Sequence, residues 1–233
     1  MIRSFSALAV VALLCSAASA DGLIYQLPKD GSWSQYDTKV QYKRGDRTID
    51  TSGKLRIASV GKVTEDDKAC RWIEITLEMK LGETSRTIVA KLLTPESELK
   101  AGGNPLKKRL RGWVRMGDNA EVHELTDDRL GPLNIWLAPP LKEQKTLEPE
   151  EVDSVLGSKK CAGVTGVTEF TENGNENRAV IQVRRHNDAP FGAVTSTTTV
   201  EIRRDNEIFQ TGELSFRLTG IGTDAETRLP DHK

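Results

Sequence analysis

Apolar and polar residues alternate along much of this chain. In the stretch RWIEITLEMK (71–80), every second residue from Ile73 onward is apolar: Ile73, Ile75, Leu77 and Met79. The residues between them are Glu74, Thr76 and Glu78, all polar. Because neighbouring side chains of a β-strand point to opposite faces, this spacing predicts a strand with one buried and one solvated face.

The same alternation recurs elsewhere, which makes β-structure the expected class. Clear patterns occupy residues 85–93, 177–186, 194–204 and 213–220, and weaker ones occupy 36–44, 53–60 and 162–170. Turn-forming clusters, most of them rich in Gly or Asn, separate several of these segments: residues 81–84, 171–178 and 203–207. We expect about eight to ten strands, joined mainly by short turns into an antiparallel sheet.

The middle of the chain lacks this regularity. Thr94 followed by Pro95 is typical of a helix start. Residues 104–117 have an apolar spacing that fits a helix, although RGWVRM within them (111–116) also fits a strand. A further short strand is expected at 121–126.

Residues 133–151 are predicted to be irregular, since Pro139 and Pro140 interrupt them. The expected fold is mainly β, of the α+β type: a curved antiparallel sheet or half-barrel with a few short helices covering one side. The chain has no internal repeat and no low-complexity linker. Residues 21–233 are therefore predicted to form a single β-rich domain with a helical or irregular insertion at about 94–151.

The N-terminus has the order of a secretory signal peptide. Arg3 is followed by a nearly apolar run and then by small residues. An A-x-A triplet predicts cleavage after Ala20, so residues 1–20 are expected to be removed and the mature chain to be periplasmic or extracellular. The alternative is a lipid on Cys15, but Leu14 stands where a lipoprotein signal has a small residue. No segment of the mature sequence is long and apolar enough to predict a transmembrane helix.

Cleavage at that point leaves two cysteines, Cys70 and Cys161. In an oxidising compartment, two cysteines of one exported domain are expected to form a disulfide. The alternative is a pair of separate buried thiols that pack as small apolar side chains. There is no CxxC pair, so neither a redox motif nor a structural zinc site is expected.

The charges are balanced, which argues against nucleic acid as a partner. The 233 residues carry a net charge of −1, and loss of Arg3 makes the mature chain −2 (−1 minus +1). One cluster contains no acidic residue: Lys107, Lys108, Arg109, Arg111 and Arg115. It predicts either a contact with an anionic head group or acidic partner, or the exposed face of an amphipathic segment.

Residues suited to catalysis are few. His123 lies between Glu121 and Glu124, and His186 stands two residues before Asp188. Either histidine supports a hydrolase hypothesis, yet the sequence contains no HExxH, GxSxG, Walker, GxGxxG or EF-hand motif. We therefore expect no metal, no cofactor and no enzymatic activity.

Three aromatic residues are candidates for contact with an apolar ligand: Trp113, Trp136 and Phe191. Trp136 precedes the double proline, and Phe191 lies between Pro190 and Gly192. Such residues either line the mouth of a binding site or fill the end of a hydrophobic core.

Three stretches resemble a known group of proteins: GSKKCAGVTGVTEF (157–170), NRAVIQVRRHNDAPFGAVTSTTTVEI (177–202) and LKKRLRGWVRMG (106–117). They are similar to small secreted proteins related to the LolA and LppX lipoprotein-carrier superfamily, over about half of the mature chain. The resemblance implies a strongly curved, incompletely closed sheet, with helices over its open side and a hydrophobic cavity between. Members with known roles carry acyl chains or lipoproteins. No residue of this chain matches a ligand contact of that family.

The leading hypothesis is an exported, non-enzymatic binding protein that carries a lipid or a lipoprotein acyl chain in a half-barrel cavity. The second is a structural or interaction protein of the envelope or extracellular space, with a filled core and the basic cluster facing a partner protein. The third is a hydrolase that uses His123 or His186.

Overall fold

The computed structural model describes residues 22–82, 84–126, 133–172, 174–205 and 207–229. Its elements are eleven strands, one 3-10 turn and one short helix. In chain order they are β1 (Trp33–Arg44), β2 (Arg47–Glu65), β3 (Lys68–Leu81), β4 (Thr84–Pro95), η1 (Glu96–Glu98), β5 (Arg111–Met116), β6 (Val122–Glu124), α2 (Leu133–Leu137), β7 (Lys142–Ser154), β8 (Gly157–Glu172), β9 (Asn175–Arg185), β10 (Ala193–Arg204) and β11 (Glu207–Gly222).

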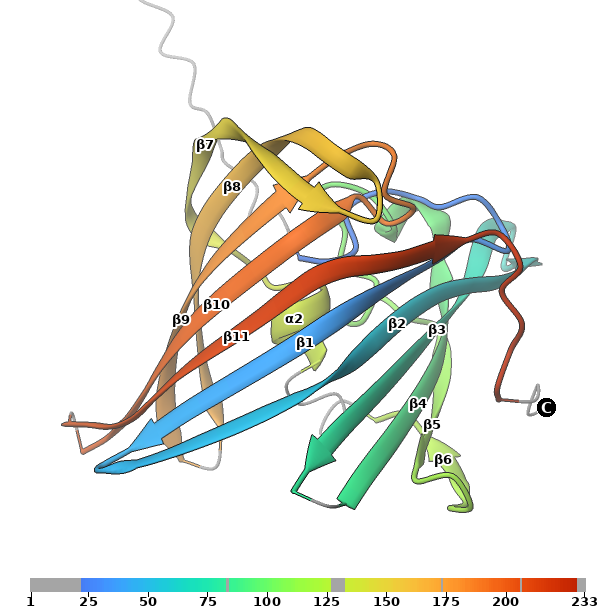
Figure 1. The fold of residues 1–233 in the computed structure, drawn as a ribbon. Helices are drawn as coiled ribbons and strands as arrows, with labels where there is room; N and C mark the ends of the chain where they lie inside the picture. The colour runs from blue at the N-terminus through green and yellow to red at the C-terminus, as the bar shows by residue number, and fades with distance from the viewer. Residues whose placement is uncertain (1–21, 83, 127–132, 173, 206, 230–233) are drawn as a thin grey trace, which may run out of the picture.

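All eleven strands belong to one antiparallel sheet. Their spatial order is β6-β5-β4-β3-β2-β1-β11-β10-β9-β8-β7. The first and last strands of the chain are therefore neighbours in the middle of the sheet, and β6 and β7 form its two edges (Figure 1). The prediction of a mainly β fold with an antiparallel sheet is confirmed.

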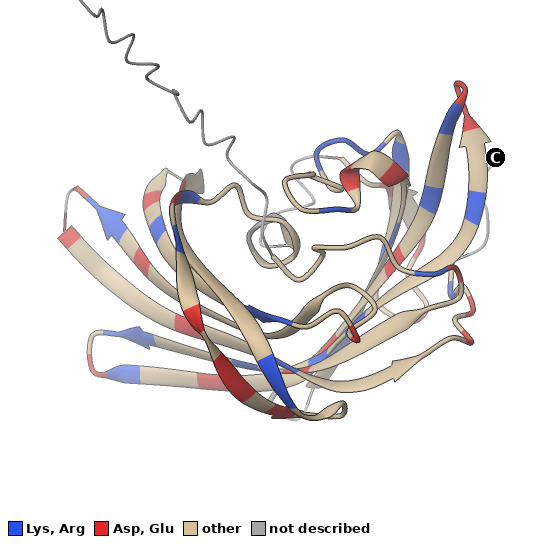
Figure 2. Cartoon of the chain, turned by 90° about the horizontal axis from the view of Figure 1, so that it is seen from above, with Lys and Arg blue, Asp and Glu red and all other residues tan. Residues whose placement is uncertain are grey.

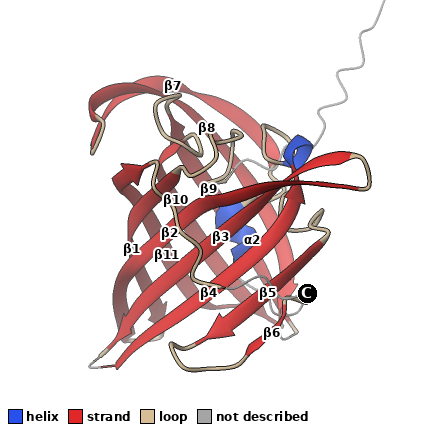
Figure 3. Ribbon diagram, turned by 90° about the vertical axis from the view of Figure 1, so that its right-hand side faces the viewer, coloured by secondary structure: helices blue, strands red, loops and turns tan. Residues whose placement is uncertain are grey.

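The sheet curves into an arc that is open on one side. Seen from above, α2 and several loops lie inside this arc (Figure 2). We call the face that looks into the arc the concave face and the opposite one the convex face. Coloured by secondary structure, the molecule consists almost entirely of strands, with very little helix (Figure 3).

The alternation seen in the sequence sorts side chains between these two faces. Along β1, Tyr36 and Val40 are buried on the concave face, whereas Asp37 and Lys39 are exposed on the convex face. In the strand register, Tyr36 lies opposite Leu55 of β2 and Leu218 of β11, and all three are fully buried. The apolar members predicted in 71–80, 177–186 and 213–220 likewise lie in the core.

The middle of the chain contains more strand than the sequence predicted. RGWVRM forms β5 and not part of a helix, because it pairs with β4 along its whole length. Arg111 lies opposite Leu93, and Met116 lies opposite Ile88. The expected helix at Thr94 is only the one-turn η1. The expected irregular region contains β7, a 13-residue strand. Most side chains of this edge strand are exposed, so it lacks the alternation that marks the other strands.

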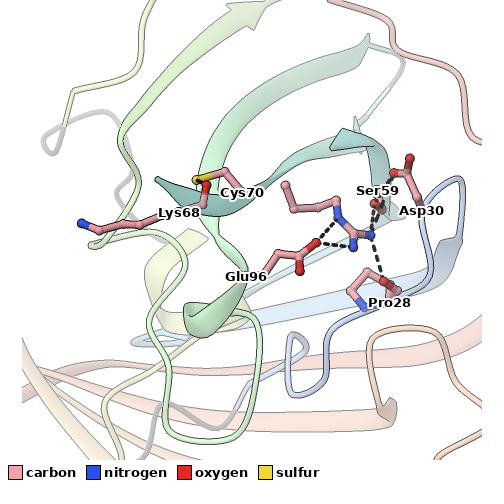
Figure 4. A network of polar contacts seen from close by, with 7 residues as sticks. Pro28, Asp30, Ser59, Lys68, Cys70 and Glu96 are labelled. Atoms are coloured by element: carbon pink, nitrogen blue, oxygen red, sulfur yellow. Dashed lines mark hydrogen bonds and ion pairs between the residues drawn. The ribbon is translucent and has the colours of Figure 1, made fainter. Parts of the chain in front are cut away.

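A buried arginine ties the start of the chain to the sheet. Arg71 of β3 is 2% exposed, and its guanidinium donates to the carbonyl oxygen of Pro28 (2.9 Å) and to Ser59 Oγ (2.9 Å). It also forms an ion pair with Glu96 at the start of η1 (2.6 Å), and Ser59 donates to Asp30 (3.0 Å) (Figure 4). Ser59 lies where the β2–β3 register shifts, so this network fixes both a bulge and the N-terminal segment.

Replacing Arg71 by Met should lower the free energy of unfolding by about 3 kcal/mol, because Glu96, Ser59 and the Pro28 carbonyl all lose their common donor. Urea denaturation followed by circular dichroism measures this. Arg86→Met, on the exposed part of β4, is the matched control and should change stability by no more than about 0.5 kcal/mol. Equal effects of the two substitutions would contradict the role given to the Arg71 network.

Candidate functional site on the concave face

The floor of the arc is apolar across most of its width. Residues from five different strands cover it, each 2% exposed or less: Tyr36, Leu55, Ile75, Ile181 and Phe216. Alternation places these side chains on one face, and the antiparallel register brings them side by side. A surface of this kind needs an apolar partner, because leaving it in water costs about 25 cal/mol for each Å².

Three short segments of the same chain cover part of this floor, and we call them together the plug: residues 22–26, 133–141 and 186–192. Leu23, Ile24, Leu137 and Phe191 are the main apolar side chains of the plug, and each is at most 1% exposed. The ring of Trp136 lies 5.9 Å from that of Phe216 on the floor. A further loop adds Leu99 and Leu106, both fully buried in the same core.

The plug segments are hydrogen-bonded to one another through their main chains. Ile24 N donates to the Leu137 carbonyl (3.1 Å), and Tyr25 N donates to the Phe191 carbonyl (2.9 Å). The Gln26 side chain donates to the Ala189 carbonyl (2.6 Å). The hydrogen bonds of Ile24 and Tyr25 therefore join the N-terminal segment to the other two segments, and the plug forms one connected unit.

Tyr36 places a polar group at the centre of the floor. Its hydroxyl donates to the carbonyl oxygen of Ala193 (3.1 Å), at the start of β10. Burial raises the pKa of Tyr36 far above its ordinary value, so the phenol is neutral at physiological pH.

Two of the three predicted aromatic residues lie in the plug. The main-chain carbonyls of Trp136 and Phe191 both accept hydrogen bonds from the N-terminal segment, at Leu23 N and Tyr25 N. Trp113 lies apart from them, on the convex face of β5, where its ring is 5.3 Å from that of Trp72. The plug itself was not predicted, because it depends on hydrogen bonds between segments more than 100 residues apart, which no local pattern encodes.

The basic cluster is divided among different environments. Lys107 and Lys108 are exposed in the turn before β5. The Arg109 guanidinium donates to the carbonyls of Leu106 (2.7 Å) and Leu125 (2.9 Å), so it stabilises the main chain. Arg111 forms an ion pair with Glu65 (2.5 Å), and Arg115 is half-buried on the same strand.

The two candidate histidines lie far apart in the sheet. His123 is exposed on the edge strand β6, opposite Val114. His186 follows β9, and its Nδ1 accepts a hydrogen bond from Asp188 N (3.2 Å). Lys159 forms an ion pair with Asp188 (2.9 Å) and lowers the pKa of that carboxyl. Among the described residues, no group of three or more His, Cys, Asp or Glu side chains is placed to hold a metal ion.

The predicted disulfide is wrong: Cys70 and Cys161 are both free and buried. Cys70 lies on β3 and Cys161 on β8, and six strand-to-strand steps of about 4.8 Å each separate them along the sheet. A disulfide needs Cα atoms within about 7 Å. Desolvation raises the pKa of both thiols, so they behave as small apolar groups.

The convex face carries a polar cleft of about 800 Å³ beneath the β7–β8 hairpin. Its walls include Lys39, Arg184 and Arg217 as well as acidic residues of β7. Arg184 forms an ion pair with Glu150 (2.6 Å) across it. This mixture of charges offers no continuous apolar surface, so the cleft does not suit an acyl chain.

No helix in the described part of the chain is long and apolar enough to cross a membrane.

No protein-family model and no curated protein sequence matches the chain. Among solved structures, it is similar to a DUF1329 family protein from Desulfovibrio piger, with 11% identity and a TM-score of 0.34, over 81% of this chain and 84% of that one. It is also similar to a LolA superfamily protein from Nitrosomonas europaea, with 11% identity and a TM-score of 0.31, over 90% of this chain and 91% of that one. The resemblance to the LolA superfamily is thus found again as a weak likeness between structures.

The two free thiols give a direct test of the cysteine assignment. In a chain that begins at Asp21, the intact mass should correspond to two free thiols, and both should react with iodoacetamide only after unfolding. The free energy of unfolding should also fall as pH rises above about 8.5, because the unfolded chain then releases protons that the folded chain keeps. Cys161→Ala should reduce this alkaline loss. A mass two hydrogens lower, or a stability independent of pH in this range, would contradict it.

Proposed function

We propose that this chain is an exported, non-enzymatic binding protein whose concave face holds the acyl part of a lipid or lipoprotein. The observation that carries the proposal is the way the apolar floor is covered. Short segments lie on it, and the plug segments bond to one another through their main chains, which allows them to move as a unit. The ligand takes the place of the plug on the floor.

In this proposal the gain from burying an acyl chain offsets the cost of displacing the plug. An acyl chain gains about 0.8 kcal/mol for each CH₂ group that leaves water. The floor keeps an apolar partner in both states, so the cost lies mainly in exposing the apolar side chains of the plug: Leu23, Ile24, Leu137 and Phe191.

Two buried hydroxyl groups support an amphiphilic ligand over a plain hydrocarbon. Thr38 of β1 and Thr198 of β10 are 2% and 1% exposed, and both point to the concave face. Neither Thr38 Oγ1 nor Thr198 Oγ1 has a hydrogen-bond partner within the described part of the structure. An ester or amide carbonyl of a lipid supplies the acceptor that such hydroxyls need.

Trp136 is the internal reporter for this proposal. A fatty acid brominated along its chain should quench tryptophan fluorescence on binding, because bromine quenches on contact. Trp136 packs against the floor residue Phe216 before the exchange, and in this proposal it stays beside the acyl chain that takes the place of the plug. Trp136→Phe should remove most of this quenching. Trp113→Phe, which changes a tryptophan of the convex face, should leave it in place.

Quenching that persists in Trp136→Phe and disappears in Trp113→Phe would place the acyl chain on the convex face and refute the proposal. Absence of quenching in the unmodified chain, together with no bound lipid in protein isolated from its own host, would refute it as well. Native mass spectrometry followed by organic extraction measures the second quantity.

The filled interior also favours the second candidate, a structural or interaction protein of the envelope. In that case the plug is a permanent part of the core, and the basic residues before and along β5 contact an acidic partner. Reversing the charge of Lys107 and Lys108, which are exposed, should then abolish capture of the partner. The lipid-carrier proposal expects no effect of these changes on fluorescence quenching.

A further inference from the structure

Two charged residues are buried on the convex face. Glu74 of β3 is 3% exposed and Lys91 of β4 is 2% exposed. The strand register places them directly opposite each other. Buried charges are costly unless they are paired and hydrogen-bonded, so whatever covers these two residues must supply polar partners.

The cover is the C-terminal segment, residues 223–229, which we call the strap. It leaves β11 and turns back beside the sheet, where it is red in Figure 1. Arg228 N and Leu229 N both donate to the Glu74 carboxylate (2.9 and 3.2 Å), and the Thr227 hydroxyl lies 2.8 Å from it. Lys91 Nζ donates to the Leu229 carbonyl (3.2 Å). Glu74 and Lys91 together form what we call the strap site.

The strap site recognises main-chain groups of an extended segment. Two successive N–H groups reach the carboxylate, and one carbonyl reaches the ammonium. The Leu229 side chain adds an apolar anchor, because it is fully buried. Main-chain hydrogen bonds combined with one or more side-chain pockets are the usual means by which proteins bind extended peptides.

The rest of the strap is held loosely. Its residues 223–228 are exposed or half-exposed. The side chain of Trp33 donates to Asp224 (2.7 Å) and Ala225 N donates to the Gly31 carbonyl (2.8 Å), while a polar cleft of about 440 Å³ separates residues 224–228 from the sheet. Glu74 lines this cleft, so its carboxylate meets water and not an apolar wall when the strap leaves.

We propose that the strap site also receives the strap of a second copy of this chain. Thr227, Arg228 and Leu229 of one copy make the same contacts with Glu74 and Lys91 of the other. Residues 223–226 serve as the linker in either arrangement, because few contacts bind them to their own sheet. Such exchange of an identical segment creates a dimer without any new side-chain chemistry. This site is independent of the ligand proposed for the concave face.

The test uses two complementary full-length variants. Glu74→Gln weakens the site and keeps the strap, because the amide offers one acceptor oxygen in place of two and carries no negative charge opposite Lys91. Arg228→Pro combined with Leu229→Ala spoils the strap and keeps the site, because proline has no N–H and alanine lacks the anchor. Each change should weaken strap binding at least about tenfold.

An equimolar mixture of the two variants should form a dimer at concentrations where each variant alone is monomeric. The intact strap of one variant then binds the intact site of the other, because in each chain either the strap or the site is changed. Light scattering after size-exclusion chromatography measures this, and circular dichroism checks folding. Wild type mixed with mass-labelled wild type should form mixed dimers at high concentration. Glu78→Gln is the matched control. Glu78 lies on the same strand, and among the described residues it forms an ion pair with the exposed Arg228 guanidinium (3.4 Å). A mixture that contains Glu78→Gln in place of Glu74→Gln should therefore form no dimer.

A mixture of folded variants that stays monomeric would overturn the proposal. Formation of the same dimer with Glu78→Gln in place of Glu74→Gln would overturn it too. If Glu74→Gln does not fold, Lys91→Met takes its place as the variant that lacks a functional site, with the same two outcomes.

Discussion

Hydrogen bonds between β1 and β11 determine the architecture of this molecule, because they join the first and last strands in the middle of one continuous sheet. A single sheet has two faces, and the described residues form no second sheet inside the arc. The apolar face must therefore be covered by segments that connect strands or lead into them. This requirement explains why residues 22–26, 99–106 and 133–141 contribute side chains to the core although they form almost no regular structure.

The central position of β1 and β11 also determines where the two ends of the described chain go. The segment before β1 joins the plug on the concave face, and the segment after β11 lies on the convex face. Arg71 fixes the first and Glu74 the second, and these residues are three positions apart on β3. Because their separation is odd, their side chains point to opposite faces, so one strand holds both ends of the chain.

The sequence predicted the strands whose two faces differ and failed where both faces are alike. Ile73 to Leu77 alternate because one side is core. Strand β7 was missed since most of its side chains are exposed. The free cysteines were misjudged because their distance depends on strand order, which the sequence did not reveal. Trp136 and Phe191 were chosen as candidate ligand contacts from their neighbouring prolines, which stays a prediction, and the plug that unites them was not predicted.

Glu74 and Lys91 show why the strap site was not predicted. In the sequence they are ordinary polar residues on the solvated side of alternating strands, where Glu and Lys are expected. Only the fold shows that the strap covers this part of the convex face and gives hydrogen-bond partners to both charges. A charge pair that another segment of the chain covers therefore marks the place where that segment binds. The same reasoning applies to Thr38 and Thr198 on the concave face, where hydroxyl groups stand without acceptors among the described residues. On each face, polar groups buried against the local rule support the proposal made for that face.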